Sequence, residues 1–295
     1  MAPGLKVSAR CALLAGLLAV GCAHGGGQAD LATLTSNSDQ VIWEAGEKAL
    51  KKHDYEAARQ HFKRIIEAFP QSEYGPPARL AIGDAYFQEG GTANYILAVG
   101  AYREFLTLYP SHPRSDYAQM QVAESFFKQR NGPDRDQTPT QHALEEFERL
   151  LQLFPSSPLA EPAHARLAEC RQSLARSEFL AGYFYQKTRK ACRAAIIRYE
   201  AVLKEYPEYG HTDEVLFRLA ECLTMVGRGA EALPHLDRVM KDFSNSEYAN
   251  DARKLLETAA QNPLPPPAAV ASPSPAASPE PSPQPSPTPS PGTRP

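Results

Sequence analysis

Histidine, cysteine and carboxylate side chains are the groups of this sequence that could catalyse a reaction or bind a metal. Their spacing argues against both. The sequence contains no Gly-Lys-Ser/Thr phosphate loop, no Gly-x-Ser-x-Gly elbow and no His-Glu-x-x-His pair. The eight histidines are scattered. Glu145, Glu146 and Glu148 cluster beside Arg149, which is typical of the solvated face of an amphipathic helix. We therefore expect no catalysis, no cofactor and no metal.

Cys22 is the exception, because its surroundings predict covalent attachment of lipid. Basic residues precede ten apolar residues, 11–20, a run long enough for the core of a signal peptide and too short to span a bilayer. The run ends in Ala19-Val20-Gly21-Cys22, which resembles the bacterial lipobox, with Leu18 one position earlier than the usual leucine. We predict a lipoprotein signal peptide over residues 1–21 and acylation, palmitate included, at Cys22.

The segments on either side of the central region are predicted to be linkers. Residues 22–38 contain three consecutive glycines and many small polar side chains, which predicts a flexible tether. Residues 261–295 alternate proline with serine and alanine and cannot bury enough apolar surface to fold, so we expect a disordered tail. Acyl chains hold a protein to a membrane by about 0.8 kcal/mol per buried methylene. The mature chain should therefore be anchored without spanning.

Export would leave three further cysteines in an oxidising compartment, and an odd number cannot form a closed set of disulfides. These are Cys170, Cys192 and Cys222. Cys170 and Cys222 fall where other units carry Ala85 and Ser125. We interpret them as small residues buried at close helix contacts, and a disulfide is the alternative.

The central region, residues 39–260, carries an internal repeat. Arg166-Leu-Ala-Glu-Cys170 and Arg218-Leu-Ala-Glu-Cys222 are identical phrases. Four units also contain an alanine, an aromatic residue four positions later and a proline eight positions after that, and a fifth unit keeps the spacing with leucine and serine. The five sets are Ala58, Phe62 and Pro70; Ala98, Tyr102 and Pro110; Ala143, Phe147 and Pro155; Ala195, Tyr199 and Pro207; and Ala232, Leu236 and Ser244.

A small residue precedes each of these alanines, and the resulting pattern resembles the tetratricopeptide repeat of two helices per 34 residues. The small residue lets the helices approach closely, the alanine and the aromatic share one helix face, and proline ends the second helix. The small residues are Gly46, Gly83, Ala123, Gly182 and Ala220. We predict an all-α fold, an α-solenoid of about five tetratricopeptide-like hairpins. The longer second and third units leave open whether their insertions form loops or helical turns.

The ends of the repeats resemble those of the outer-membrane-protein assembly lipoproteins of the BamD (YfiO) family. The segments that carry the resemblance are Phe69-Pro-Gln-Ser-Glu-Tyr74, Tyr109-Pro-Ser-His-Pro113, Phe154-Pro-Ser-Ser157 and the insertion Asp134-Arg-Asp-Gln137. The Pro-rich tail departs from the family pattern. So does Cys192, which is expected in a turn where repeats usually place an aromatic residue.

The resemblance implies a lipid-anchored protein of the cell outer membrane that faces the periplasm. It implies as partners a barrel-type insertase, other lipoproteins of the assembly complex and unfolded outer-membrane protein segments. It further implies that the N-terminal repeats receive substrate segments and that the C-terminal repeats hold the insertase. The alternative is a periplasmic repeat scaffold for cell-envelope or Tol-Pal-linked division processes. Such scaffolds usually carry an N-terminal coiled coil, for which residues 39–45 leave no room.

The first helices of a superhelical array line its concave side, where aromatic and acidic side chains could grip an extended peptide. The candidates for this partner-binding groove are Trp43, Glu47, Asp84, Phe87, Tyr117, Glu124 and Phe127. For each of them, a place in the core or on a solvated helix face is the alternative. The net charge of −3, with both signs mixed, gives no basic stripe and so argues against a nucleic-acid partner.

Overall fold

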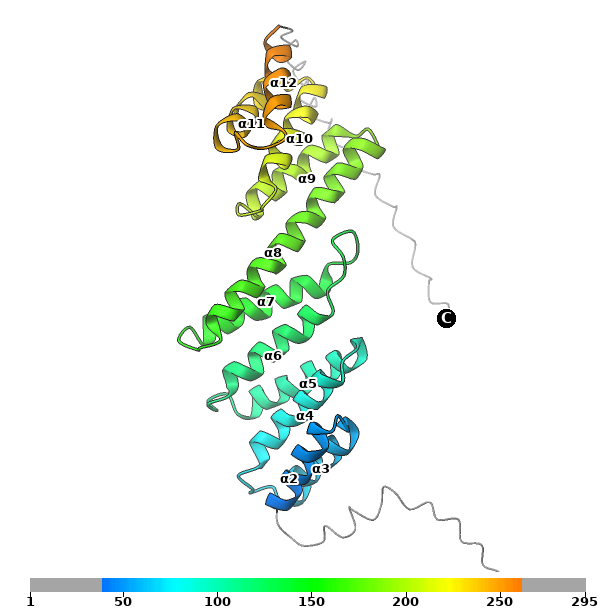
Figure 1. Cartoon of the computed structure of the whole chain (residues 1–295), viewed down its shortest axis with the longest axis vertical. Helices are drawn as coiled ribbons and strands as arrows, with labels where there is room; N and C mark the ends of the chain where they lie inside the picture. Colours follow the sequence, from blue (N-terminus) through cyan, green and yellow to red (C-terminus); the bar gives the residue numbers. More distant parts are fainter. Residues whose placement is uncertain (1–38, 262–295) are drawn as a thin grey trace, which may run out of the picture. The chain divides into compact units, whose positions relative to one another are not determined.

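The computed structural model describes residues 39–261, and every regular element in this range is a helix (Figure 1). The predicted all-α class is confirmed. The described residues divide into two compact units, residues 39–118 and 119–261. The predicted signal peptide and tether, and the predicted tail from residue 262 onward, lie outside the described residues. None of the helices in residues 39–261 combines the length and apolarity needed to cross a membrane.

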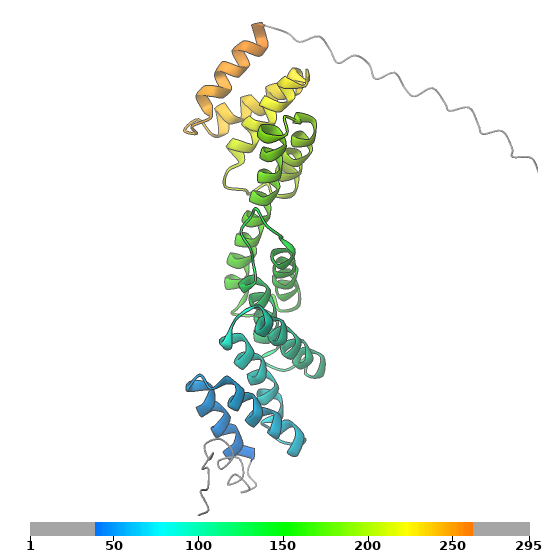
Figure 2. The ribbon, with the colours of Figure 1, turned by 90° about the vertical axis from the view of Figure 1, so that its right-hand side faces the viewer.

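The first unit contains two helical hairpins in which each helix packs against the next, as in tetratricopeptide repeats (Figures 1 and 2). Its helices are α2 (Asp39–Lys51), α3 (Tyr55–Ala68), α4 (Gly75–Glu89), α5 (Thr92–Leu108) and the beginning of α6 (Ser115–Lys128), which continues into the second unit. Ile42, Phe62 and Ile65 form its core with Ala78 of α4.

The second unit continues the pattern with α7 (Thr138–Leu153), α8 (Ala160–Tyr183), the π-helical turn η1 (Phe184–Thr188), α9 (Cys192–Glu205), α10 (Thr212–Met225), α11 (Gly229–Asp242) and α12 (Ala249–Gln261). One core joins α6, α7 and α8, and a second joins α8 to α12. The last helix, α12, packs on α11 and buries Ala252. The described residues thus form five hairpins followed by one additional helix.

Each hairpin with a glycine in its first helix is closed by an aromatic ring of its second helix lying on that glycine. A Cβ atom added to Gly46 would lie 2.6 Å from the ring of Phe62, and the same distance separates Gly83 from Tyr102 and Gly182 from Tyr199. These rings are fully buried. The close approach predicted from the spacing therefore has a direct cause: a larger residue in the first helix would overlap the ring.

The second helices end at an aromatic residue that precedes the predicted proline. Phe69 leaves the helix with φ of −131° while its amide still donates to the carbonyl of Ile65. The residue that follows is Pro70, which has no N–H group to continue the ladder. Phe243 ends α11 in the same conformation, φ −128°, although Ser244 follows it. The fifth unit thus stops its helix without proline.

The inserted residues of the second, third and fourth repeats take different forms. In the second repeat the extra length goes into α5, which has 17 residues against 14 in α3. In the third repeat the inserted residues form a loop between α6 and α7, where the Gln137 side chain donates to the carbonyl of Gly132 at 2.7 Å. The fourth repeat has a 24-residue first helix, α8 (Figure 1). Its first half packs in the core with α6 and α7, and its second half packs in the core that extends to α12.

Two residues lie elsewhere than their sequence context suggested. Cys192 was expected in a turn, but it is the buried first residue of α9, where its thiol packs among apolar side chains. Glu146 was expected on a solvated face, but it is buried and accepts a 2.7 Å hydrogen bond from Gln119. Its neighbours Glu145 and Glu148 are less buried. The helical periodicity of the sequence cannot distinguish a buried glutamate from an exposed one, because it does not reveal the polar partner on the adjacent helix that makes burial of the carboxylate possible.

Substitution of Gly83 by alanine should destabilise the first unit. The new methyl group would overlap the buried ring of Tyr102, and relieving such overpacking costs about 1–3 kcal/mol. Gly100→Ala is the matched control, because at this exposed α5 position the added Cβ would meet no atom of residues 39–261 within 4 Å apart from its chain neighbours and the backbone of its own helix. Alanine there should stabilise the helix by about 0.5–1 kcal/mol. Urea unfolding of both variants measures the difference, and equal midpoints would contradict the ring-on-glycine contact.

Candidate functional site

The residue that directly follows the small residue of the repeat pattern is acidic in four of the five repeats. These residues are Glu47, Asp84, Glu124 and Glu221, and Tyr183 takes the place in the fourth unit. The first three were predicted as partner-binding residues and Glu221 was missed. The signal that could have found it is its position directly after Ala220, within the repeated phrase that ends at Cys222.

Asp84 and Tyr117, predicted separately from the sequence, meet in the first unit. The hydroxyls of Tyr102 and Tyr117 donate to the same Asp84 Oδ1 atom, at 2.7 and 2.9 Å. Burial raises the pKa of Asp84 above its ordinary value, against the lowering effect of the two tyrosine hydroxyls and the nearby Arg114 guanidinium. Burial also raises the pKa of both tyrosines. The carboxylate therefore fixes two rings, in addition to any contact with a partner.

Trp43 lies between a ring of its own repeat, Phe62, and the ring of Tyr74, which immediately precedes α4 of the next repeat. Its ring centroid is 5.2 Å from that of Phe62 and 5.6 Å from that of Tyr74, onto which it stacks. Phe217 and Tyr248 form the same stack in the fifth unit, at 5.3 Å. Trp43 is half-buried, so one part of the indole supports the hairpin and another remains open to a partner.

Glu47 and Phe87 keep more freedom. Glu47 is half-buried one helical turn after Trp43, and its carboxylate has no ion-pair or hydrogen-bond partner among residues 39–261. Phe87, also half-buried, packs against Tyr95 with a centroid distance of 5.6 Å. Ile96 and Leu97 follow on α5 and are 60% and 48% exposed. The first unit thus presents aromatic and aliphatic surface, together with a carboxylate that no described side chain neutralises.

Glu124 and Phe127 are brought together in the second unit by an arginine that the sequence had not singled out. Arg166 of α8 donates to Glu124 at 2.8 Å, and its guanidinium lies 4.5 Å from the centroid of Phe127. Arg130 covers the same ring at 3.4 Å. Phe127 is only 7% exposed, so its ring has little surface left to offer a partner. Its observed contacts position two guanidinium groups.

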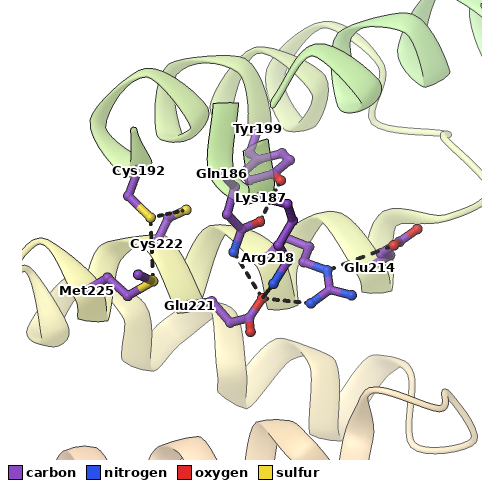
Figure 3. Close-up of polar contacts among 9 residues, drawn as sticks. All are labelled: Gln186, Lys187, Cys192, Tyr199, Glu214, Arg218, Glu221, Cys222 and Met225. Carbon is purple, nitrogen blue, oxygen red and sulfur yellow. Dashed lines mark hydrogen bonds and ion pairs between the residues drawn. The ribbon is translucent and has the colours of Figure 1, made fainter. Parts of the chain in front are cut away.

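In the fifth repeat, a polar cluster equivalent to that around Glu124 surrounds Glu221 (Figure 3). Its Oε2 atom accepts from Arg218 at 2.8 Å and from the Gln186 amide at 3.1 Å, and it lies 3.7 Å from Lys187. The Gln186 carbonyl in turn accepts from the buried Tyr199 hydroxyl at 2.8 Å. Arg166 and Arg218, the first residues of the two identical phrases, both pair with a glutamate three positions later, at 2.9 and 2.8 Å.

A groove that no sequence motif indicated lies beside α8. The helix packs against both α7 and α9. A hollow of about 360 Å³ lies between α8 and the end of α9 with the turn that follows, and an adjoining hollow of about 580 Å³ lies among α7, α8 and the end of α9. They share Arg171, Glu205, Tyr206 and Pro207 in their walls. Gln172 borders the groove and ties it to the following turn by donating to Glu208 at 2.8 Å and accepting from the Gly210 amide at 3.0 Å.

Residues 35–235 match the model of the YfiO family, described as outer membrane lipoprotein. This chain belongs to the YfiO family. The matched range extends from before α2 to within α11 and contains every predicted partner-binding residue of the repeats. The YfiO-family match does not include α12 or the Pro-rich tail.

Named relatives agree with the YfiO assignment. The outer membrane protein assembly factor BamD of Caulobacter vibrioides is 28% identical over 254 residues, which cover 85% of this chain and 81% of that protein. BamD of Rickettsia prowazekii is 28% identical over 251 residues, covering 83% and 96%. Among solved structures, a thermophilic TPR protein of Thermus thermophilus aligns with 76% of this chain and 100% of that chain, at 19% identity and a TM-score of 0.31.

The stability of this YfiO-family chain should respond to the ionisation of Asp84. Because the folded state raises the pKa of Asp84, it binds this proton more tightly than the unfolded chain does. The resulting stabilisation is present at low pH and is lost as pH rises from the ordinary value of 3.8 through the folded pKa. Asp84→Asn cannot titrate. The free energy of unfolding of the wild type minus that of Asp84→Asn should therefore fall as the pH rises above the ordinary carboxyl pKa of 3.8.

Urea unfolding at a series of pH values gives this difference. Tyr117→Phe is the control, because it removes one donor and leaves the carboxyl and the Tyr102 hydrogen bond in place. The free energy of unfolding of Tyr117→Phe minus that of Asp84→Asn should therefore also fall as the pH rises. A difference that stays constant with pH, or that rises, would show that Asp84 is not desolvated.

Proposed function

We propose that this protein is a lipid-anchored, non-catalytic subunit of the machinery that assembles β-barrel proteins in the outer membrane. The observation that carries the proposal is the match to relatives named outer membrane protein assembly factor, over more than four-fifths of both chains for the Caulobacter vibrioides protein. The family match over residues 35–235 supports the same role. The protein acts as a repeat scaffold that holds its partners side by side.

Attachment to the outer membrane is assigned to Cys22. Acylation of this thiol and removal of residues 1–21 would place the lipid at the start of the mature chain, with residues 22–38 as a tether and the repeats facing the periplasm. The apolar run and the lipobox-like Ala19-Val20-Gly21-Cys22 support this assignment.

The first unit is assigned to unfolded outer-membrane protein segments. Such segments are extended and alternate apolar with polar side chains. Trp43, Phe87 and the exposed α5 residues Ile96 and Leu97 offer apolar contact, and Glu47 offers an uncompensated negative charge. Asp84 and Tyr117 contribute by fixing the rings of this unit.

The second unit is assigned to the barrel-type insertase and to other lipoproteins of the assembly complex. Its groove between α7, α8 and the end of α9 combines Tyr206 and Pro207 with the charged Arg171 and Glu205. Aromatic and arginine side chains are the types that dominate binding energy at protein interfaces. Arg166 and Arg218, positioned by Glu124 and Glu221, add two guanidinium groups with fixed orientation.

Purification from membranes in mild detergent tests the assembly role. We expect the protein to retain a large outer-membrane barrel with periplasmic repeat domains, identified by mass spectrometry. Cys22→Ala is the control. Without the thiol the chain should leave the membrane fraction, while its helical circular dichroism stays unchanged, because Cys22 lies outside the described repeats. Recovery of Tol-Pal or peptidoglycan-linked proteins in place of the barrel would favour a scaffold for envelope division and contradict the proposal.

Charge reversals should separate the two proposed surfaces. Arg171→Glu is expected to weaken retention of the insertase about tenfold, or about 1.4 kcal/mol, and to leave the unfolding midpoint unchanged. Its pairing with Glu148 at 3.0 Å joins two half-exposed side chains and contributes little to stability. Arg238→Glu on α11 is the matched control, since Arg238 is similarly exposed, pairs with Asp242 and does not line the groove.

Glu47→Lys should have the opposite profile. It should reduce cross-linking of unfolded outer-membrane protein segments to the first unit and leave the insertase bound. The exposed α3 substitution Lys63→Glu serves as its control. If Glu47→Lys and Arg171→Glu weakened the same partner to the same extent, the assignment of one partner to each unit would be wrong.

A further inference from the structure

Two cysteines of the second unit bring their thiols into direct contact. The Sγ atoms of Cys192 and Cys222 lie 2.8 Å apart (Figure 3). A disulfide bond is about 2.05 Å long, so only a small side-chain adjustment separates the two thiols from bonding distance. The cysteines are 30 positions apart and come from different repeats, α9 of the fourth and α10 of the fifth.

The surroundings of this pair leave it no competing thiol among the described residues. Cys192 and Cys222 are 6% and 0% exposed within the core that joins α8 to α12. The third described cysteine, Cys170, is buried in the other core of the unit, among side chains of α6, α7 and α8. The thioether of Met225, 68% exposed, lies 3.6 Å from Cys192 Sγ.

The location of the protein makes oxidation of such a pair favourable. Members of the YfiO family are outer membrane lipoproteins, and disulfides form and persist in the bacterial envelope outside the cytoplasm. Two thiols held in contact by the packing of two helices are oxidised more readily than two thiols that must first find each other. The odd number of cysteines is accounted for, since Cys170 remains a buried thiol whose pKa burial raises to about 11.

We propose that Cys192 and Cys222 form a disulfide in the exported protein and that this bond clasps the fourth repeat to the fifth. This proposal rests on the export assigned above. The oxidant is the disulfide of an envelope dithiol oxidase. The Cys192 thiolate attacks it and forms a mixed disulfide while one oxidase sulfur leaves as a thiolate. The Cys222 thiolate then displaces the second oxidase sulfur. Two electrons and the two cysteine protons pass to the oxidase, which departs as a dithiol.

The clasp has a defined structural effect. It joins the first turn of α9 to the last turn of α10, directly beside the hydrogen bond from Gln186 to Glu221 (Figure 3). In a chain of repeats each hairpin is stabilised mainly by its neighbours, so the last repeats open first. A bond between the fourth and fifth repeats opposes that opening. It would hold the Arg218–Glu221 pair in place without taking part in partner binding.

Peptide mass spectrometry tests the bond on the full-length protein purified from membranes without reductant. The protein is denatured, treated with iodoacetamide and digested with trypsin. We expect the peptides Ala191–Arg193 and Leu219–Arg228 as one linked species, two hydrogens lighter than their sum and separated by reductant. The peptide Leu167–Arg171, with Cys170, should be alkylated and serves as the internal control. Alkylation of Cys192 and Cys222 without prior reduction would overturn the proposal.

Matched variants add a second measurement. Reductant should lower the unfolding temperature of the wild type and of Cys170→Ser by roughly 5–10 °C. It should have no effect on the Cys192→Ser/Cys222→Ser double variant, whatever that variant's own stability. Equal responses of Cys170→Ser and the double variant would count against the clasp. The assembly role is measured separately by co-purification of the insertase, so it can survive the failure of the disulfide.

Discussion

The contact on which the rest of this structure depends is a buried aromatic ring lying against a glycine of the preceding helix. Gly46, Gly83 and Gly182 leave no space for a side chain above Phe62, Tyr102 and Tyr199. This contact fixes how closely the two helices of a hairpin approach and which faces they turn toward each other. A protein interior packed at the density of an organic crystal does not tolerate one additional methyl group at such a point.

The position beside this contact is acidic in four of the five repeats. Because the small residue faces the second helix, the next residue lies at the edge of the helix interface, close to groups from neighbouring helices. Asp84, Glu124 and Glu221 occupy this edge and bind tyrosine, arginine and glutamine side chains. In each case the carboxylate orients the side chains around it. Three of the five repeats contain such a site, and the identity of the bonded side chains makes each site different.

The fourth repeat departs from this regular pattern in the length of its first helix, α8, which borders the groove described above. A first helix of 24 residues packs in the core of the third unit at one end and in the core of the fourth at the other. The groove that borders Arg171 and Tyr206 lies along this helix. Beyond it, the contact between Cys192 and Cys222 joins the fourth unit to the fifth.

The sequence by itself determined the helical class, the five hairpins and the small-residue, alanine and aromatic contacts, because these depend on local periodicity and on residue size. It also indicated Asp84 and Tyr117, but not that Tyr102 joins them. Only the tertiary structure decided which partners meet: Arg166 with Glu124, Gln186 with Glu221, and Cys192 with Cys222. It likewise placed Glu146 in the interior and extended α8 beyond one repeat. These contacts join residues 27 to 42 positions apart, and their existence depends on helix packing that no single helix encodes.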